Sequence, residues 1–71
     1  MPHISIEGPP IRELETKRKL VEGLTEAAAN AYGLRKEIIT VLIKENAPEN
    51  VGVGGQLLVD RWKAESEKSP D

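Results

Sequence analysis

The first two residues of the chain, Met1 and Pro2, offer the clearest candidate for chemistry. If Met1 is removed, Pro2 becomes the N-terminal residue and presents a secondary amine. An α-amino group has a pKa of about 7.7 to 8.0 before perturbation, and burial in an apolar pocket or a nearby cation lowers it further. Pro2 is therefore a candidate general base at neutral pH. The alternative is that Pro2 only begins an edge strand, where its missing N–H donor does no harm.

The length of the chain, 71 residues, allows one small domain. Below ~70 to 80 residues a single core rarely supplies more than ~3 to 5 kcal/mol, so small domains usually gain stability from another source. The sequence has no cysteine and one histidine, which excludes disulfides and argues against a metal site. Self-association remains, and we expect a homo-oligomer.

Charged residues make up 31% of the chain but balance to a net charge of −2. The sequence lacks a basic block that would hold a phosphate backbone, so nucleic acid is not an expected partner. The longest apolar run, residues 38–43 interrupted by Thr40, is far shorter than the roughly 20 residues of a membrane-spanning helix. We also find no signal-sequence pattern, and expect a cytoplasmic protein that contacts no membrane.

The start of the chain has the pattern of a strand. Within residues 2–7 the apolar side chains of Pro2, Ile4 and Ile6 alternate with polar ones, as in a strand with one covered face. A glycine and two prolines follow, and two adjacent prolines neither extend a ladder nor enter a helix interior. We therefore expect the strand to end there.

The following segments predict a helix and a second strand. Residues 13–32 have the periodicity of an amphipathic helix, with ion pairs such as Glu13 to Lys17 on its solvated face and a left-handed end at Gly33. Residues 38–43 are apolar on both faces, which is typical of a parallel strand covered above and below. One helix covers only one face of a two-stranded sheet, so another subunit must cover the other face.

The last segments contain three glycines, within residues 51–59, and then a charged tail. The glycines lack the spacing of a phosphate-binding loop and do not lie between a first strand and its helix. A short hairpin with glycines at positive φ fits better. The fold class is therefore α/β, a β-α-β subunit with parallel strands and a C-terminal hairpin. We expect one domain over residues 1–62 and a polar tail, 63–71, that frays.

Four features of the sequence together indicate a family. They are the opening Met-Pro-His-Ile-Ser-Ile, Arg12 ahead of the helix, the second strand ending in Lys44 and Glu45, and Gly-Val-Gly-Gly-Gln-Leu at 52–57. In this combination, which aligns without gaps over nearly the whole chain, the sequence resembles the 4-oxalocrotonate tautomerase family, small-subunit members of the tautomerase superfamily. The resemblance implies dimers with a four-stranded sheet and, in most members, a hexamer made of three dimers.

The resemblance also implies an activity. Such enzymes are isomerases that use no cofactor and interconvert enol and keto forms, or double-bond isomers, of a small 2-oxo acid or dienol such as 2-hydroxymuconate, in aromatic degradation. Pro2 matches the family's general base. Arg12 matches the arginine that holds the distal carboxylate of the substrate, and a guanidinium suits this task because it binds carboxylates in a bidentate way. The alternative for Arg12 is a surface residue ahead of a helix.

At two candidate substrate-binding positions the chain departs from the family pattern. Thr40 stands where the best-known members carry a second arginine, and Val51 stands where they carry an aromatic wall. The first change removes a cation that would polarise the 2-oxo group. The second removes some of the apolar lining that lowers the pKa of the amine. The substrate is therefore less well defined than the reaction type.

Two other functions stay open from the sequence. Water addition to an unsaturated acid, as dehalogenase relatives perform, generally needs a carboxylate beside the proline. Separately, Glu7 and Glu45 are candidates for an acid–base pair, but no pattern in the sequence brings them together. The chain is alternatively a non-catalytic, self-assembling binding protein in which Pro2 is inert. In either case we expect Trp62, in an otherwise polar tail, to dock on a neighbouring subunit.

Overall fold

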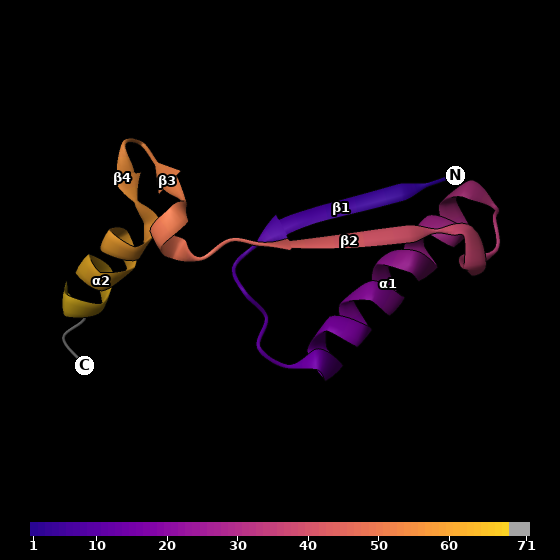
Figure 1. The fold of residues 1–71 in the computed structure, drawn as a ribbon, viewed down its shortest axis with the longest axis horizontal. Coiled ribbons are helices and arrows are strands. Elements are labelled where there is room, and N and C mark those ends of the chain that lie inside the picture. Colours follow the sequence, from indigo (N-terminus) through magenta and orange to yellow (C-terminus); the bar gives the residue numbers. More distant parts are fainter. Residues whose placement is uncertain (69–71) are drawn as a thin grey trace.

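The computed structural model describes residues 1–68, which form a β-α-β unit followed by a small C-terminal unit (Figure 1). Strands β1 (His3–Gly8) and β2 (Thr40–Glu45) pair in parallel. Helix α1 (Leu14–Tyr32) connects them and lies along one face of the pair (Figure 1). The predicted β-α-β subunit with parallel strands is confirmed.

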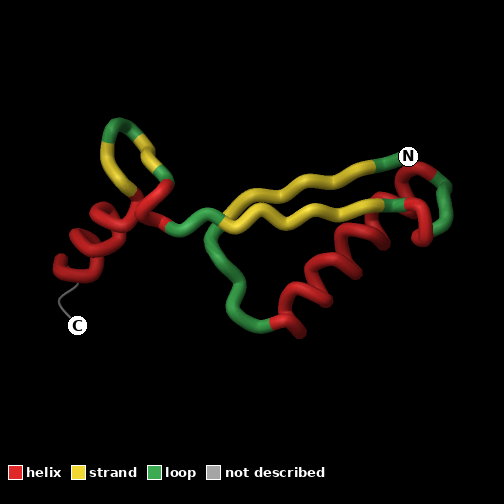
Figure 2. The backbone as a smooth tube through the Cα atoms, in the orientation of Figure 1, coloured by secondary structure: helices red, strands yellow, loops and turns green. Residues whose placement is uncertain are grey.

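The C-terminal unit consists of a hairpin and a helix. A 3-10 turn leads into strands β3 (Gly52–Val53) and β4 (Gln56–Leu57), which pair antiparallel, and helix α2 (Leu58–Lys68) follows directly. Figure 2 shows this unit beyond the carboxyl ends of β1 and β2, on the far side from most of α1. Neither α1 nor the described part of α2 is long and apolar enough to span a membrane.

The two long strands have one covered and one uncovered face. The covered face consists of half-buried apolar side chains: Ile4, Ile6, Val41 and Ile43. The uncovered face consists of exposed side chains: His3, Ser5, Glu7, Thr40, Leu42 and Lys44. The alternation predicted for the start of the chain is thus confirmed, and it directs α1 to one face of the sheet.

Strand β2 begins later than the apolar run predicts. Ile38 ends a 3-10 turn, Lys36–Ile38, and the strand starts only at Thr40. The N–H groups of the two isoleucines before Thr40 bond to carbonyls three residues back, so they do not join the ladder. The expectation of a strand apolar on both faces is therefore wrong, because Leu42 is the one apolar side chain that β1 and β2 present on the uncovered face.

Glycines in the left-handed region end α1 and make the hairpin turn, as expected. Gly33 has φ 68° and its N–H donates to the carbonyl oxygen of Ala29 at 2.9 Å. Gly54 and Gly55, with φ of 62° and 83°, form the two-residue connection between β3 and β4. Positive φ at both central residues matches the twist of a tight hairpin, and only glycine adopts it without strain.

Helix α2 extends into the residues where a fraying tail was expected. The Leu58 N–H donates to the carbonyl oxygen of Val51 at 2.8 Å, so the helix begins on the base of the hairpin. The described part of the predicted tail, 63–68, is thus helical rather than coil. The expected fraying at residues 69–71 lies outside the described residues.

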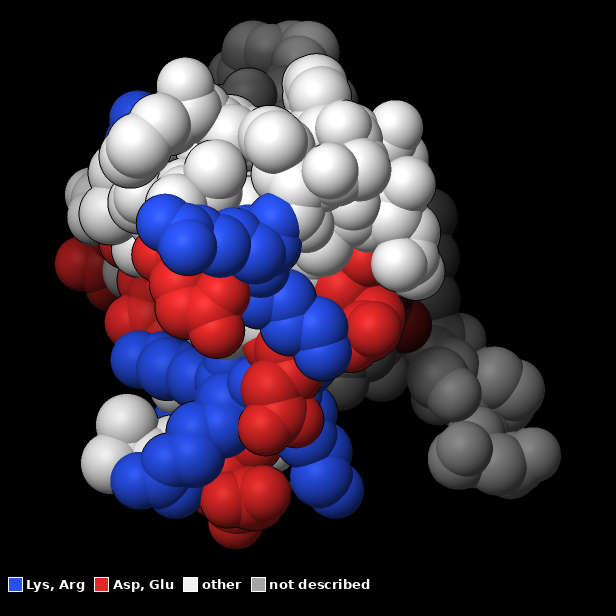
Figure 3. Space-filling model, turned by 90° about the vertical axis from the view of Figure 1, so that its right-hand side faces the viewer, with Lys and Arg blue, Asp and Glu red and all other residues white. Residues whose placement is uncertain are grey.

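The single chain exposes more surface than a globular protein of its mass. Its accessible surface is 5709 Å², whereas a compact monomer of this size exposes about 4,400 Å². Its radius of gyration is 16.5 Å, against about 11 Å for a compact domain. In Figure 3, which views the molecule from the right-hand side of Figure 1, charged side chains gather over the lower half of the view, while the upper half is largely uncharged. A single chain therefore leaves more surface exposed than a compact monomer does.

Candidate active site

Pro2 lies at the open start of β1, next to β2. Its carbonyl oxygen accepts a hydrogen bond from the Thr40 N–H at 3.2 Å, and His3 pairs with Thr40 in the register. The structure thus brings two of the four candidate residues, Pro2 and Thr40, together. Pro2 is half-buried, while Met1, whose carbonyl makes the nitrogen of Pro2 an amide, is 90% exposed. Removal of Met1 would leave the Pro2 nitrogen at the end of an ordered strand.

Arg12 lies at the opposite end of β1, in the loop that leads to α1. The strand between the two residues has six residues, which corresponds to about 20 Å at ~3.3 Å per residue. The Arg12 side chain is exposed and forms no ion pair within residues 1–66, whose side chains are described. One chain therefore does not bring Pro2 and Arg12 to the same site.

Val51 lies in the C-terminal unit, in a hollow of about 250 Å³ that it lines with Leu58 and Trp62. Two other residues that line this hollow are bonded to each other: the Asn46 side-chain amide donates to a Glu7 carboxylate oxygen at 3.3 Å. Trp62, 45% exposed, thus adds an aromatic wall beside Val51 that the sequence analysis did not foresee. No periodicity links the two residues, because the hairpin and the start of α2 separate them.

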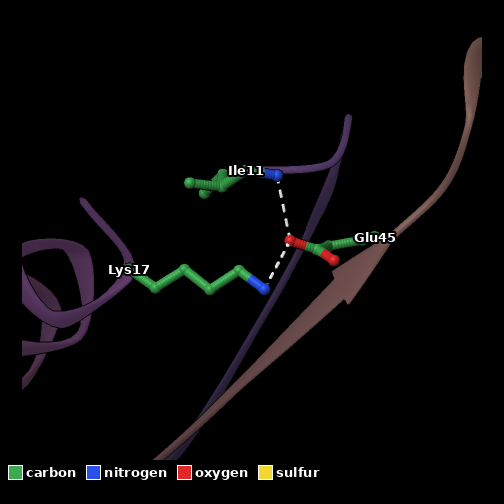
Figure 4. A network of polar contacts seen from close by, with 3 residues as sticks. All are labelled: Ile11, Lys17 and Glu45. Carbon is green, nitrogen blue, oxygen red and sulfur yellow. Dashed lines mark hydrogen bonds and ion pairs between the residues drawn. The ribbon is translucent and has the colours of Figure 1, made fainter. Parts of the chain in front are cut away.

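Three residues, Ile11, Lys17 and Glu45, form a group of polar contacts that joins the end of β2 to the loop before α1 and to α1 itself; we call this group the polar tie (Figure 4). One oxygen of Glu45, Oε2, accepts a hydrogen bond from the Ile11 N–H at 2.9 Å. The same oxygen forms an ion pair with the Lys17 ammonium, also at 2.9 Å. The spacing of Lys17 predicted an ion pair with Glu13, but Lys17 pairs with Glu45 instead. Glu45 and Glu7 do not form an acid–base pair either, since each carboxylate is bonded to other groups.

The two bonds lower the pKa of the Glu45 carboxyl below its ordinary value, first through the Ile11 N–H and then through Lys17. A carboxyl with a lowered pKa stabilises the fold above its ordinary pKa, and this contribution disappears as the pH falls through the folded-state value. Wild-type protein should therefore have a higher melting temperature than Glu45→Gln at neutral pH. The difference should shrink in acid, below a pH of about 4.3.

Circular dichroism melts from pH 7 to pH 3 measure this difference. Lys36→Met, which breaks the 2.6 Å ion pair of Lys36 with Glu26, is a control for losing a surface ion pair elsewhere. A Glu45→Gln difference that stays constant over this range would contradict the prediction.

The chemistry at the two ends of β1 differs. The Pro2 end offers a nitrogen and the Thr40 hydroxyl, whereas the Arg12 end offers a guanidinium. Residues 1–66, whose side chains are described, contain no group of three acidic or histidine side chains placed to hold a metal ion. An amine and a guanidinium are groups that suit proton transfer on an organic acid, but in one chain they lie at opposite ends of β1.

Comparison with known proteins gives consistent relatives. A sequence profile described as "Tautomerase enzyme" matches residues 2–61. A 2-hydroxymuconate tautomerase from Bacillus subtilis (strain 168) is 37% identical over 60 residues, which cover 84% of this chain and 97% of that protein.

Solved structures agree with these relatives. The crystal structure of DmpI from Archaeoglobus fulgidus is 46% identical, with a TM-score of 0.76, and covers 83% of this chain and 100% of its own. A 4-oxalocrotonate tautomerase isozyme from Methylibium petroleiphilum is 32% identical, with a TM-score of 0.81 and coverage of 89% and 98%. The profile match and these relatives show that the chain belongs to the tautomerase family and is an isomerase.

Proposed function

We propose that the protein tautomerises small 2-oxo acids and their enols, such as 2-hydroxymuconate, with Pro2 as the general base once Met1 is removed. The observation that carries the proposal is the family match that begins at Pro2, a half-buried residue at the start of β1 behind an exposed Met1. The relative from Bacillus subtilis, a 2-hydroxymuconate tautomerase, supports the class of substrate.

In this mechanism the Pro2 amine, in its free-base form, accepts a proton from one position of the enol. The protonated amine, now an ammonium group, then donates a proton to a carbon further along the conjugated chain. No atom is gained or lost overall, and the amine is regenerated. A base of this kind works best when its pKa lies near the working pH. Backbone N–H groups at the site would stabilise the negative charge that develops on the substrate oxygen.

The proposed substrate has a carboxylate at each end, and the two ends need different partners. Arg12 would hold the distal carboxylate in a bidentate way. Thr40 offers a hydroxyl that donates one hydrogen bond but carries no charge. Thr40 should therefore bind the 2-oxo end of the substrate more weakly than an arginine at the same position would.

A site that uses both Pro2 and Arg12 must draw them from different subunits, because they lie about 20 Å apart along β1. We therefore propose a homo-oligomer in which the Arg12 loop of one subunit completes the site at Pro2 of another. The surface of 5709 Å² that one chain exposes supports such assembly. A hexamer of three dimers, with a four-stranded sheet in each dimer, is the form that the family resemblance favours.

The direct test is turnover of 2-hydroxymuconate and of phenylenolpyruvate, followed by ultraviolet absorbance. Intact mass must first establish that the protein begins at Pro2. Ketonisation of at least one enol well above the rate in buffer is expected. Processed, folded protein that turns over neither compound would contradict the proposal, and would favour a binding role for the fold.

Replacement of Arg12 by alanine should impair the diacid far more than the monoacid. Hydrogen bonds to a charged group are worth roughly 1.5 to 3 kcal/mol, so kcat/KM for 2-hydroxymuconate should fall about 10- to 100-fold. Phenylenolpyruvate lacks the distal carboxylate and should be little affected. The control is Arg18→Ala, which removes an exposed arginine of α1 that pairs with Glu15 at 3.2 Å. Equal losses on both substrates would assign Arg12 a structural role.

A further inference from the structure

We propose that Glu45 and Lys17 are positioning residues for Arg12, which fix the direction in which the Arg12 side chain leaves the loop between β1 and α1. The Glu45 carboxylate holds the N–H of Ile11, the residue immediately before Arg12. The inference rests on the proposed function, in which Arg12 binds the distal carboxylate of the substrate.

The loop is anchored at Ile11 in two ways. Its backbone N–H is bonded to Glu45 at 2.9 Å, and its half-buried side chain lines a hollow with Leu20 of α1 and Ile43 of β2. The two residues before Ile11 are prolines, whose φ angles are fixed. Arg12 therefore follows a residue that is held by both its backbone and its side chain.

Lys17 completes the tie from the side of the helix. It lies near the start of α1 and bonds to the same carboxylate oxygen that accepts the Ile11 N–H (Figure 4). The adjacent Asn46 N–H continues the ladder by donating to the carbonyl oxygen of Gly8 at 2.8 Å. One carboxylate thus connects the end of β2, the Arg12 loop and α1.

The exposure of the pair indicates what the tie is for. The Lys17 and Glu45 side chains are 31% and 29% exposed, and ion pairs in contact with solvent add little to stability. The rate of reaction is more sensitive to the position of a substrate-binding group, since a misplacement of ~1 Å costs as much as ~100-fold in rate. Loss of the tie should therefore change substrate selectivity more than it changes folding.

A double-mutant cycle between Glu45→Ala and Arg12→Ala tests the inference in the full chain. We expect Glu45→Ala to lower kcat/KM for 2-hydroxymuconate about tenfold, within the range for a displaced binding group, with little change for phenylenolpyruvate. In the Arg12→Ala background the same replacement should have almost no further effect on the diacid, because residues that act through one another are not additive.

Graded variants separate the two bonds of the carboxylate. Glu45→Gln keeps an oxygen that accepts the Ile11 N–H but loses the ion pair, whereas Lys17→Met leaves the carboxylate without its cation. Both should shift the ratio of diacid to monoacid activity less than Glu45→Ala does, and Lys17→Arg should restore the wild-type ratio. Lys36→Met, which breaks the ion pair with Glu26, should leave this ratio unchanged.

The outcomes distinguish the inference from the function on which it rests. If Arg12→Ala impairs the diacid selectively but Glu45→Ala does not, or if the two effects add, the positioning role is overturned and the proposed function stands. If Arg12→Ala itself shows no selectivity, the role of Arg12 fails and the positioning role fails with it. Circular dichroism and sedimentation verify folding; should Glu45→Ala not fold, Glu45→Gln and Lys17→Met decide the question by the same ratio.

Discussion

Protein that keeps Met1 is expected to tautomerise enols about 10² to 10⁴ times more slowly than protein that begins at Pro2, the usual contribution of a positioned general base. The nitrogen of Pro2 is an amide while Met1 is attached, and amide resonance removes its basicity. Because Met1 is 90% exposed, its presence should not disturb the fold. The loss should therefore be one of chemistry and not of stability.

Two tagged forms of the chain make this comparison. An uncleaved tag ahead of Pro2 blocks the nitrogen, whereas a tag after Asp71 leaves Pro2 free for processing, as intact mass can verify. Pro2→Ala retains a primary amine after processing and should keep residual activity. The pH profile of the processed enzyme should rise as the amine loses its proton. Equal rates for the blocked and processed proteins would rule out Pro2 as the base.

Replacement of Leu42 by glutamate is expected to dissociate the oligomer and remove activity together. Leu42 is 44% exposed in the single chain and is the apolar residue on the uncovered face of the β1–β2 sheet. A subunit that covers this face would bury the new charge, which is costly. Because the proposed site needs Arg12 from another subunit, loss of assembly should abolish turnover. Sedimentation velocity and activity measured on the same samples test both effects.

Two further substitutions serve as controls for Leu42→Glu. Val41→Glu places the charge on the covered face against α1 and should unfold the subunit itself. Asn30→Glu adds the same charge at an exposed position of α1 and should change neither assembly nor activity. A wild-type monomer that is folded and active at micromolar concentration would refute both the assembly and the shared site.

Local patterns were sufficient to predict the β-α-β unit. The alternation around Ile4 and Ile6 defines the covered face of β1, and the helical period up to Gly33 defines α1 almost to the residue. The paired glycines predict the hairpin because positive φ is a local requirement. These features depend on neighbours within a few positions, and a sequence displays such neighbours directly.

Features that depend on distant residues were not predictable. The Glu45 carboxylate bonds to Ile11, 34 positions away, and captures Lys17, whose spacing had suggested Glu13. The hollow beside Val51 gains Trp62 only because the hairpin turns the chain back. The start of β2 was misplaced because the isoleucines before it are apolar in a turn as well as in a strand. The candidate site was predicted as residues but not as an arrangement.

Within the described residues, the main sheet of one subunit consists of β1 and β2, so each of them is an edge strand. An edge presents unpaired N–H and C=O groups that template pairing with any extended chain nearby. In newly made subunits, docking on the correct partner therefore competes with aggregation. Docking needs two folded copies, so the yield of native enzyme should depend on how quickly β1, α1 and β2 form relative to how often chains meet. Refolding by dilution out of denaturant, carried out at several protein concentrations, would reveal this competition. The yield of native enzyme should pass through a maximum as the protein concentration rises.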